Sequence, residues 1–449
     1  MAQATDSVPV IVVGGGWAGL TAAVELTRHG VPVTLLESAR QLGGRARCVA
    51  FGPHRVDNGQ HVMIGAYRSM LDLLDRLGVS EQSIFLRCPL ELPMYAPGQR
   101  NVHLKAPRLP APLHMLAALL GARGLSPADR LRALRFGAWA TSAHAVPDPD
   151  VTVQALLAAR KQSTRLVANL WEPLCLAALN TPIRDASARL FLKVLRETFT
   201  GTRRNADLLI PRTDLGTALP QPALDFIEAH RGKVRLGRRV RALRIGPNGT
   251  TGVDLADERL SARHVILAVN PVMCRRLLAP HDPLRGLAES LAGLRNEPIC
   301  TVYLQYPDGT RLERPMVGLV GTTTQWVFDR AVCGQAGLMA AVISGSGPHM
   351  QLDNRQLAQA VAGELATLNP HWPPPRDTLV VREKGATFAS VVDVDALRPA
   401  HRTPVAGLWL AGDFTATGLP ATLEGAVRSG LDCARAVLAE DHLLDRKTD

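Results

Sequence analysis

The stretch Val8-Pro9-Val10-Ile11-Val12-Val13-Gly14-Gly15-Gly16-Trp17-Ala18-Gly19 decides the fold of this 449-residue chain. Its first half is a short continuous apolar run, which predicts a strand buried on both faces. Apolar residues at helical spacing follow from Leu20 to His29, and a second apolar run extends from Val31 to Leu36. This order is a complete β-α-β unit, which indicates an α/β protein that opens with a Rossmann-type nucleotide-binding domain.

The glycines of this loop have separate roles in such a unit. Gly14 permits the tight turn, Gly16 lets the backbone approach a pyrophosphate, and Gly19 allows the helix and the strand to pack closely. Trp17 and Ala18 begin the helix, where unpaired N–H groups favour anionic oxygens. The loop therefore predicts a phosphate-binding helix N-terminus.

Glu37 ends the second strand, 18 residues beyond Gly19. At a spacing of about 20 residues a carboxylate meets a ribose hydroxyl, and a carboxylate in place of an arginine disfavours a 2′-phosphate. Glycine-rich turns also precede helices for structural reasons alone. Because strand, loop, helix, strand and acid all occur here in order, we interpret the unit as a dinucleotide site.

A second glycine doublet distinguishes FAD from NAD. The run Gln41-Leu42-Gly43-Gly44-Arg45-Ala46-Arg47 follows directly after the second strand. It resembles the extended FAD signature of the amine oxidase and carotenoid desaturase superfamily. The resemblance implies FAD as the cofactor, with Gly44 and Arg45 at the diphosphate, where Arg45 would form charge-assisted hydrogen bonds.

The far end of the chain completes this resemblance. Gly407 to Ala411 is strand-like, and Ala421 to Leu438 has a helical pattern. In the superfamily this segment returns to the flavin, and the helix directs its N–H groups toward the pyrimidine ring. The resemblance assigns four residues here to the cofactor: Gly412, Asp413, Thr422 and Leu423. Glu424 is either part of that site or an ordinary first-turn acid.

Two further strands are expected in the nucleotide domain, from Val234 to Leu243 and from His264 to Val269. By resemblance, backbone at Val240 would meet the adenine. The domain is therefore expected to be discontinuous, with an interleaved substrate domain. The expected nucleotide-binding segments are 1–81, 204–272 and 401–449, and the expected substrate-domain segments are 82–203 and 273–400.

Composition and charge limit the classes of binding partner that we expect. The 51 Lys and Arg against 40 Asp and Glu give a net charge of +11, and aromatic residues make up only 4%. Because the arginines are dispersed without aromatic interleaving, nucleic acid is the weakest explanation, behind anionic lipid and a basic solvated surface. The seven scattered cysteines form no CxxC pair, which disfavours a disulfide framework and a zinc site, and we expect no metal.

The sequence contains no uninterrupted apolar stretch of about 18 residues and no recognisable signal peptide, so we expect a cytoplasmic protein. Residues 110–139 contain two helical stretches that carry Leu, Met, Phe and Trp among Arg130, Arg132 and Arg135. A basic amphipathic helix can lie on an anionic bilayer, but packing against its own protein is the more frequent explanation.

Four sequence strings point to a family that is narrower than the superfamily. They are Asp57-Asn58-Gly59-Gln60-His61 with 64–67, Asn169-Leu170-Trp171-Glu172-Pro173-Leu174 with 179–182, Gln325-Trp326-Val327-Phe328-Asp329-Arg330, and 410–430. Together they resemble the hydroxysqualene dehydroxylases of bacterial hopanoid pathways, also called squalene-associated FAD-dependent desaturases, and the resemblance runs essentially end to end.

This resemblance implies the reductive removal of the allylic hydroxyl of hydroxysqualene to give squalene. It also implies that Gly59 and Gln60 lie close to the isoalloxazine ring. A C30 isoprenoid partitions into the bilayer, so a peripheral position on the cytoplasmic membrane is expected, with 110–139 as the docking region. The sequence does not indicate what reduces the flavin.

Loss of an allylic hydroxyl requires an acid to protonate the leaving oxygen. His61, with a near-neutral pKa, and Glu172, whose pKa an apolar neighbourhood would raise, are the candidates. Either can instead be structural. Asp57 and Asp329 are weaker candidates, because Asp57 can cap the Asn58-Gly59 turn and Asp329 can pair with Arg330.

Three other classes share parts of this pattern. An amine oxidase often presents an aromatic cage, and the chain has only four tyrosines. A phytoene-type desaturase is the nearest alternative, because oxidative dehydrogenation uses the same flavin hydride step. A non-catalytic prenyl-binding escort would leave Glu37 and both glycine motifs without a role.

Overall fold

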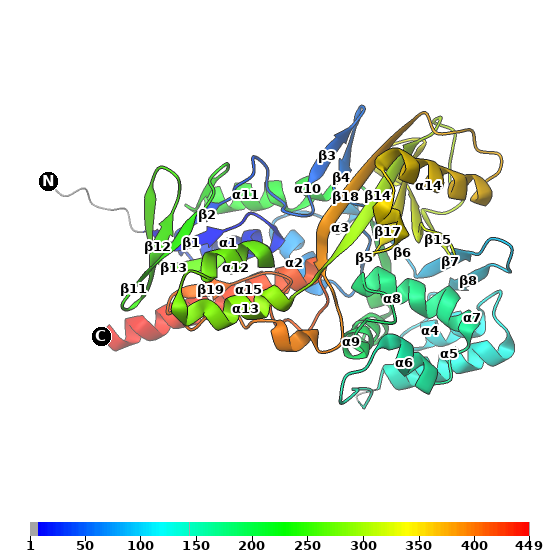
Figure 1. Ribbon diagram of the computed structural model, residues 1–449, viewed down its shortest axis with the longest axis horizontal. Coiled ribbons are helices and arrows are strands. Elements are labelled where there is room, and N and C mark those ends of the chain that lie inside the picture. Colours follow the sequence, from blue (N-terminus) through cyan, green and yellow to red (C-terminus); the bar gives the residue numbers. More distant parts are fainter. Residues whose placement is uncertain (1–7, 143, 449) are drawn as a thin grey trace.

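The computed structural model describes residues 8–142 and 144–448. Figure 1 shows an elongated molecule with a nucleotide lobe at one end and a second lobe, formed by a sheet and a group of helices, at the other. None of the described helices has the length and apolar character that a membrane span requires.

The nucleotide lobe is built on a seven-stranded sheet in the order β10-β2-β1-β13-β12-β11, with β19 also paired to β13. The pairs β2-β1, β1-β13, β13-β19 and β10-β2 are parallel, and Val12 stands opposite both Leu35 and Ile266. The strand predicted from Val8 to Val13 is confirmed, and its residues 10–13 are buried as a parallel strand covered on both faces requires. The strands are β1 (Val8–Val13), β2 (Val33–Leu36), β10 (Lys233–Arg235), β11 (Ala242–Gly246), β12 (Gly249–Asp254), β13 (Arg259–Leu267) and β19 (Leu408–Leu410).

The expectation of one strand from Val234 to Leu243 is wrong. Strand β10 ends at Arg235 and β11 begins at Ala242, and Gly237 between them has a φ of +69°. This left-handed glycine turns the chain back toward β2, because its N–H donates to Ala39 O at 2.9 Å. Val240 is therefore a buried residue in a mostly exposed connecting segment and not part of a strand.

Helices cover this sheet. The N-terminal helix α1 packs against the C-terminal helix α15 so closely that a Cβ on Gly430 would lie 2.4 Å from Ala18 O. The helices of this lobe are α1 (Trp17–Arg28), α2 (Arg68–Arg76), α10 (Leu215–Ala218), α11 (Pro220–Ala229), α12 (Pro271–Leu278), α13 (Arg285–Gly293) and α15 (Leu423–Thr448), with the short turn η3 (Asp282–Leu284).

The second lobe contains a mostly antiparallel sheet in the order β18-β14-β17-β16-β15-β7-β8. Its strands are β7 (Glu91–Tyr95), β8 (Val102–Lys105), β14 (Asn296–Gln305), β15 (Met316–Leu319), β16 (Trp326–Asp329), β17 (Leu338–Ser344) and β18 (Asp377–Phe388). Its helices are α4 (Leu113–Leu120), α5 (Pro127–Ala140), α6 (Val153–Ala159), α7 (Thr164–Leu166), the π-helical turn η1 (Val167–Trp171), α8 (Glu172–Leu179), α9 (Ala188–Phe199) and α14 (Asn354–Leu368), with 3-10 turns η4 (Arg330–Cys333), η5 (Pro348–Gln351) and η6 (Val394–Leu397).

Small elements connect the lobes. The three-stranded sheet β5-β9-β6 and the hairpin β3-β4 lie between the two large sheets. These elements are β3 (Cys48–Phe51), β4 (His54–Asp57), β5 (Met63–Ile64), α3 (Glu81–Ile84), β6 (Phe85–Cys88), η2 (Arg203–Ala206) and β9 (Leu208–Pro211). Each large sheet draws its strands from the segments expected for one domain, whereas α12 lies beside β11 of the nucleotide lobe. The exact domain boundaries stay a prediction.

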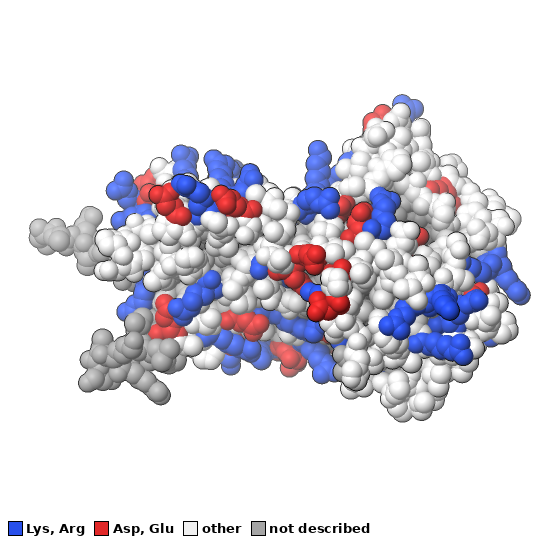
Figure 2. Space-filling view, turned by 60° about the horizontal axis from the view of Figure 1, so that its bottom comes forward, with Lys and Arg blue, Asp and Glu red and all other residues white. Residues whose placement is uncertain are grey.

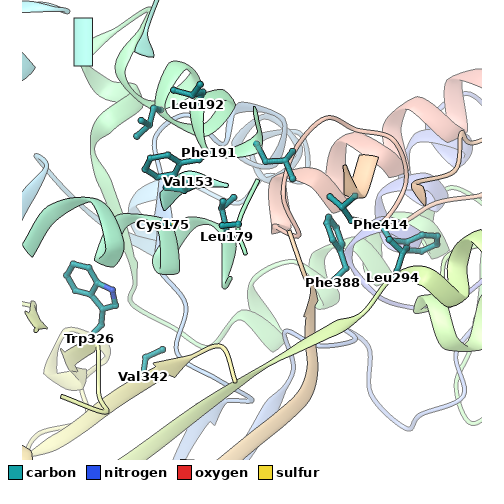
Figure 3. Packing of buried hydrophobic residues seen from close by; sticks show 14 of the residues in the cluster. Val153, Cys175, Leu179, Phe191, Leu192, Leu294, Trp326, Val342, Phe388 and Phe414 are labelled. Carbon is teal, nitrogen blue, oxygen red and sulfur yellow. The ribbon is translucent and has the colours of Figure 1, made fainter. Parts of the chain in front are cut away.

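The two lobes share one hydrophobic cluster. It includes Val13 of β1 as well as Phe191 of α9 and Trp326 of β16. Figure 3 shows Phe388 of the second sheet beside Phe414, which follows β19 of the nucleotide sheet. A core that crosses the junction fixes the lobes against each other, so residues from both can contribute to one site.

Candidate active site

The first glycine loop is shaped for close backbone packing. Gly14 has a φ of +111°, and a Cβ there would lie 2.5 Å from Ala268 O. A Cβ on Gly19 would lie 2.0 Å from Gly14 O. Gly16 is the N-cap of α1 and supplies no side chain, so the first N–H groups of the helix stay available to an anionic ligand. Trp17 and Ala18 form the buried start of that helix.

The second glycine doublet lies directly on the first loop. Gly43 N–H donates to Gly15 O at 2.8 Å, and a Cβ on Gly44 would lie 3.1 Å from Gly16 Cα. Both residues of the doublet have positive φ angles, +105° and +62°. The two motifs thus form one backbone cradle that side chains would fill, which fits the diphosphate of FAD.

Glu37 supports the wall of this cradle. Its carboxylate accepts hydrogen bonds from Gly15 N at 2.7 Å and from Ala39 N at 2.7 Å. Arg238 N–H donates to Glu37 O at 2.8 Å, so the segment that carries Val240 is tied to the same place. The structure therefore brings Glu37 and the Val240 segment together, and their contacts to ribose and adenine stay predictions.

Arg45 connects three distant parts of the chain. Its guanidinium contacts Asp413 Oδ1 at 2.7 Å and donates to Ala386 O at 2.7 Å. Arg45 comes from the second glycine motif, Asp413 follows β19, and Ala386 belongs to β18 of the second lobe. The ion pair with Asp413 positions the arginine beside the cradle, and the charge of Asp413 raises the pKa of Arg45.

The C-terminal segment places the start of α15 near the same region. Gly412 N–H donates to Ser429 Oγ at 2.8 Å, and Thr422 Oγ1 accepts from Gly425 N at 3.0 Å, which caps the helix that begins at Leu423. Glu424 is structural in these contacts. Its carboxylate accepts from Met70 N at 2.9 Å and from Ser69 N at 3.1 Å, and so it joins α15 to α2.

His61 ends a loop that the second lobe holds in place. Gly59 in this loop has a φ of +127°, and Gln60 N–H donates to Thr301 Oγ1 at 3.2 Å. Burial, with smaller effects from the positive charges of Arg330 and Arg45, lowers the pKa of His61 to about 4. The expectation of a near-neutral pKa is therefore wrong, because the cationic ring is disfavoured both by desolvation and by two arginines.

Glu172 stands at the start of α8, directly after the π-helical turn η1. Pro173 has no N–H to continue the α-helical pattern, which explains the wide turn at this point. Burial raises the pKa of Glu172, and the charge of Arg184 opposes that shift in part, so the predicted direction is confirmed. Within residues 8–142 and 144–448 no contact joins Glu172 to His61.

The two weaker candidate acids have other partners than expected. Asp57 Oδ1 accepts from Leu215 N at 2.7 Å and thus anchors the start of α10. Its burial raises the pKa of Asp57 to about 7, against the opposing charge of Arg330. The expected pairing of Asp329 with Arg330 is wrong, because Asp329 Oδ2 contacts Arg311 Nε at 2.9 Å.

A cavity of about 710 Å³ lies among α4, α5, η1, α8 and α9, and β7 and β8 form a further wall. Its lining is apolar except for Arg135 and two threonines. Trp171 and Leu174 belong to the lining, whereas Glu172, which lies between them in sequence, does not. The lining residues that sequence reasoning missed come from short segments far apart in the chain: Leu90, Leu92, Leu104, Leu195 and Phe199.

Fold and cradle together define a flavoprotein of the Rossmann type. The model of the family described as flavin-containing amine oxidoreductase matches residues 17–438. The chain belongs to this family, and it is an FAD-dependent oxidoreductase.

Individual relatives agree with this assignment. A hydroxysqualene dehydroxylase of Rhodopseudomonas palustris is 30% identical over 96% of this chain and 98% of the relative, and one of Sinorhizobium fredii is 27% identical over the same shares. A zeta-carotene desaturase of Arabidopsis thaliana is 24% identical over 94% of this chain and 83% of the relative. The resemblance to hydroxysqualene dehydroxylases is confirmed.

Solved structures confirm the fold. An oxidoreductase from Methanosarcina mazei matches with a TM-score of 0.74 and 14% identity, covering 95% of this chain and all of that one. A cyclohexylamine oxidase from Brevibacterium oxydans matches with a TM-score of 0.68 and 20% identity over 97% of this chain and all of that one. The expected α/β fold of the amine oxidase type is therefore confirmed.

Proposed function

We propose that this protein catalyses the FAD-dependent reductive dehydroxylation of hydroxysqualene to squalene. The observation that carries the proposal is the apolar cavity of about 710 Å³, lined in part by Trp171 and Leu174. A long hydrocarbon chain gains from burial against such walls, whereas a small amine needs polar partners. End-to-end similarity to proteins named hydroxysqualene dehydroxylase supports the same reaction.

The reaction balances with one proton and one hydride. The C–O bond of the allylic alcohol would break and its oxygen would leave as water, while bound reduced FAD would supply the hydride for the new C–H bond and with it the two electrons of the reduction. The chain must exclude bulk water, because water would trap an allylic cation and regenerate an alcohol. The aliphatic walls of the cavity serve that purpose.

The two candidate residues differ in their proton chemistry. Glu172 keeps its proton to a higher pH than an exposed glutamate, because burial raises its pKa. His61 is neutral at pH 7, since its pKa is about 4. We therefore assign the proton donation to Glu172 and give neutral His61 the role of a hydrogen-bonding group toward the substrate oxygen.

An anaerobic single turnover tests the reaction. The purified yellow protein is photoreduced, hydroxysqualene is added, and flavin reoxidation is followed together with squalene by mass spectrometry. Stoichiometric reoxidation with squalene formation is the expected result. Glu172→Gln should slow reoxidation more than His61→Gln, because only the first change removes the carboxyl group that we propose as the acid.

The alternatives give a different result in the same cuvette. A phytoene-type desaturase or an amine oxidase would leave the reduced flavin unchanged when hydroxysqualene is added. Its oxidised flavin would instead be bleached by a polyene or by an amine. That outcome would contradict the proposed dehydroxylase activity.

We also propose that helices α4 and α5 dock on an anionic bilayer at the inner face of the cytoplasmic membrane. Six of the eight exposed large hydrophobic residues in the described part of the chain lie between positions 109 and 146. On α4 the exposed leucines are Leu113, Leu116 and Leu120, at the i, i+3, i+7 spacing of one helical face, and Leu116 also lines the cavity. The face therefore joins the outer surface to the hydrocarbon pocket.

Charge complements these leucines. The exposed residues Arg108, Arg123 and Arg135 lie in the same stretch of sequence, and Arg132 in that stretch pairs with Asp129. Figure 2 shows Lys and Arg side chains gathered over the second lobe, on the side that carries α5 and α6, with few acidic neighbours. Basic side chains on a lobe that also exposes apolar residues favour anionic headgroups over a neutral surface.

Sedimentation with vesicles tests this surface. The protein is spun with phosphatidylcholine vesicles that contain or lack phosphatidylglycerol, at low and at high salt. We expect co-sedimentation with the anionic vesicles that weakens as salt is raised, because salt screens the arginines. Absence of binding to both vesicle types would rule out the docking surface.

A further inference from the structure

Arg330 is an almost fully buried cation, with 1% of its surface exposed. Among the described residues no ion pair joins it to a carboxylate: the neighbouring Asp329 contacts Arg311 instead, and Asp57 feels its charge without a direct contact. Burying a charge without a direct ion pair is costly unless hydrogen bonds compensate for the lost water. The hydrogen-bond partners of this guanidinium therefore indicate which part of the structure the buried charge holds in place.

Two amide side chains receive its hydrogen bonds. Arg330 Nη1 donates to Gln60 Oε1 at 2.7 Å, and Arg330 Nε donates to Gln335 Oε1 at 2.8 Å. Each amide then passes a hydrogen bond to the backbone. Gln60 Nε2 donates to His61 O at 2.9 Å, and Gln335 Nε2 donates to Arg55 O at 2.7 Å. One guanidinium thus holds both ends of the segment 55–61.

Strand β14 holds the middle of the same segment. Tyr303 Oη donates to Asp57 O at 2.9 Å, and Thr301 Oγ1 accepts from Gln60 N at 3.2 Å. All these partners come from the second lobe, whereas the segment leads from the FAD-binding end. The planar fork of an arginine suits this task, because it directs two donors at fixed angles.

We propose that Arg330 is a positioning residue that fixes the path of residues 55–61 and thereby places His61 in the reaction site. The proposal rests on the proposed dehydroxylation, for which it adds a residue that acts through Gln60. Arg330 has a second effect on the same ring, because its positive charge disfavours the protonated form of His61. Geometry and charge therefore act on one imidazole.

The test uses the flavin-bound protein with ¹³C-labelled histidine. The chain has 13 histidines, and the His61 resonance is identified by its loss in His61→Gln. In Arg330→Met, the His61 resonance should move and its titration midpoint should rise by roughly one pH unit, because a nearby positive charge has been removed. Arg330→Lys should keep the low midpoint but still shift the resonance, because a lysine lacks the two-donor fork.

Arg311→Met is the matched control, since Arg311 lies in the same part of the chain but contacts Asp329 only. It should leave the His61 signal unchanged. In single turnovers with reduced flavin, Arg330→Met should lower the reoxidation rate at least roughly tenfold, a loss typical of a misplaced catalytic group.

The NMR result decides the proposal independently of turnover. A His61 resonance and midpoint equal to wild type in Arg330→Met would overturn it. If Arg330→Met does not fold, the His61 resonance is measured in Arg330→Lys instead. An unchanged position of the His61 resonance in that variant would equally overturn the proposal. Failure of hydroxysqualene to reoxidise the wild-type flavin would instead overturn the proposed function and leave the NMR measurement interpretable.

Discussion

Gly19 marks the place where helix α1 approaches the loop that follows β1. A Cβ at this position would lie 2.0 Å from Gly14 O, and neither backbone can move without displacing the cradle. Overpacking of this kind costs about 1–3 kcal/mol. We expect Gly19→Ala to lower both the flavin content of the purified protein, measured by its visible absorbance, and the Tm.

Gly363→Ala is the control for this change. Gly363 lies within α14, and no atom lies within 4 Å of a Cβ built there. Alanine should raise helix stability at this position by about 0.5–1 kcal/mol. Full flavin content in Gly19→Ala would mean that the close approach of α1 is not required for binding.

Single residues were predictable where their partners are near in sequence or fixed by a motif. Gly14, Gly19 and Glu37 belong to one β-α-β unit, so spacing alone indicates their arrangement. Arg330 was not predictable, because its partner Gln60 lies 270 positions away. The neighbouring Asp329 offered a local partner that the structure does not use.

Helix α4 is the element on which the membrane proposal depends. We expect the triple variant Leu113→Gln, Leu116→Gln, Leu120→Gln to lose vesicle binding without loss of stability, because these side chains are 44–52% exposed. Vesicle sedimentation and Tm measure the two effects. The control is Leu236→Gln with Val272→Gln, since both side chains are exposed on the nucleotide lobe. Equal loss of binding in the control would contradict docking through α4.

Elements were predictable when their periodicity was uninterrupted. The two helical stretches expected in 110–139 are confirmed as α4 and α5. The run from Val234 to Leu243 looked equally regular, but Gly237 takes a left-handed conformation within it. Whether a glycine bends a strand depends on tertiary contacts, here with Ala39, that a sequence pattern does not contain.

At the scale of the whole molecule, Asp57 and His61 make the stability of the protein depend on pH in opposite directions. Folding raises the pKa of Asp57 from an ordinary 3.8 to about 7 and lowers that of His61 from 6.5 to about 4. Asp57 faces Arg330 and Asp214, and His61 faces Arg330 and Arg45. Between pH 4 and 6.5 the Asp57 contribution falls as pH rises, whereas the His61 contribution falls as pH drops.

Separate substitutions should therefore reveal opposite slopes. Relative to wild type, Asp57→Asn should gain stability as pH rises from 4 to 7, and His61→Gln should gain it as pH falls from 6.5 to 4. Each slope is at most about 1.4 kcal/mol per pH unit. Urea unfolding midpoints across this range measure both effects. The double variant should match the pH dependence of wild type between pH 4 and 6.5, and slopes of equal sign in the single variants would contradict the assignment.

The global arrangement was predictable only in part. The motifs at both ends indicated a nucleotide sheet closed by the C-terminal segment, and β19 beside β13 agrees with that. The second sheet and the cavity were not predictable, because antiparallel pairing between strands such as β7 and β8, and the walls that surround the cavity, depend on packing between segments with no shared motif.

The position of β19 and α15 has a consequence for biosynthesis. Strand β19 completes the nucleotide sheet, Asp413 holds Arg45, and α15 covers α1, yet all three follow residue 400. When only the first glycine motifs have been synthesised, the cradle still lacks the C-terminal residues that complete it. The nascent chain can therefore retain a flavin only after its last segment has been synthesised. Until then the apolar surfaces of β1 and α1 are uncovered, and chaperones would have to shield them.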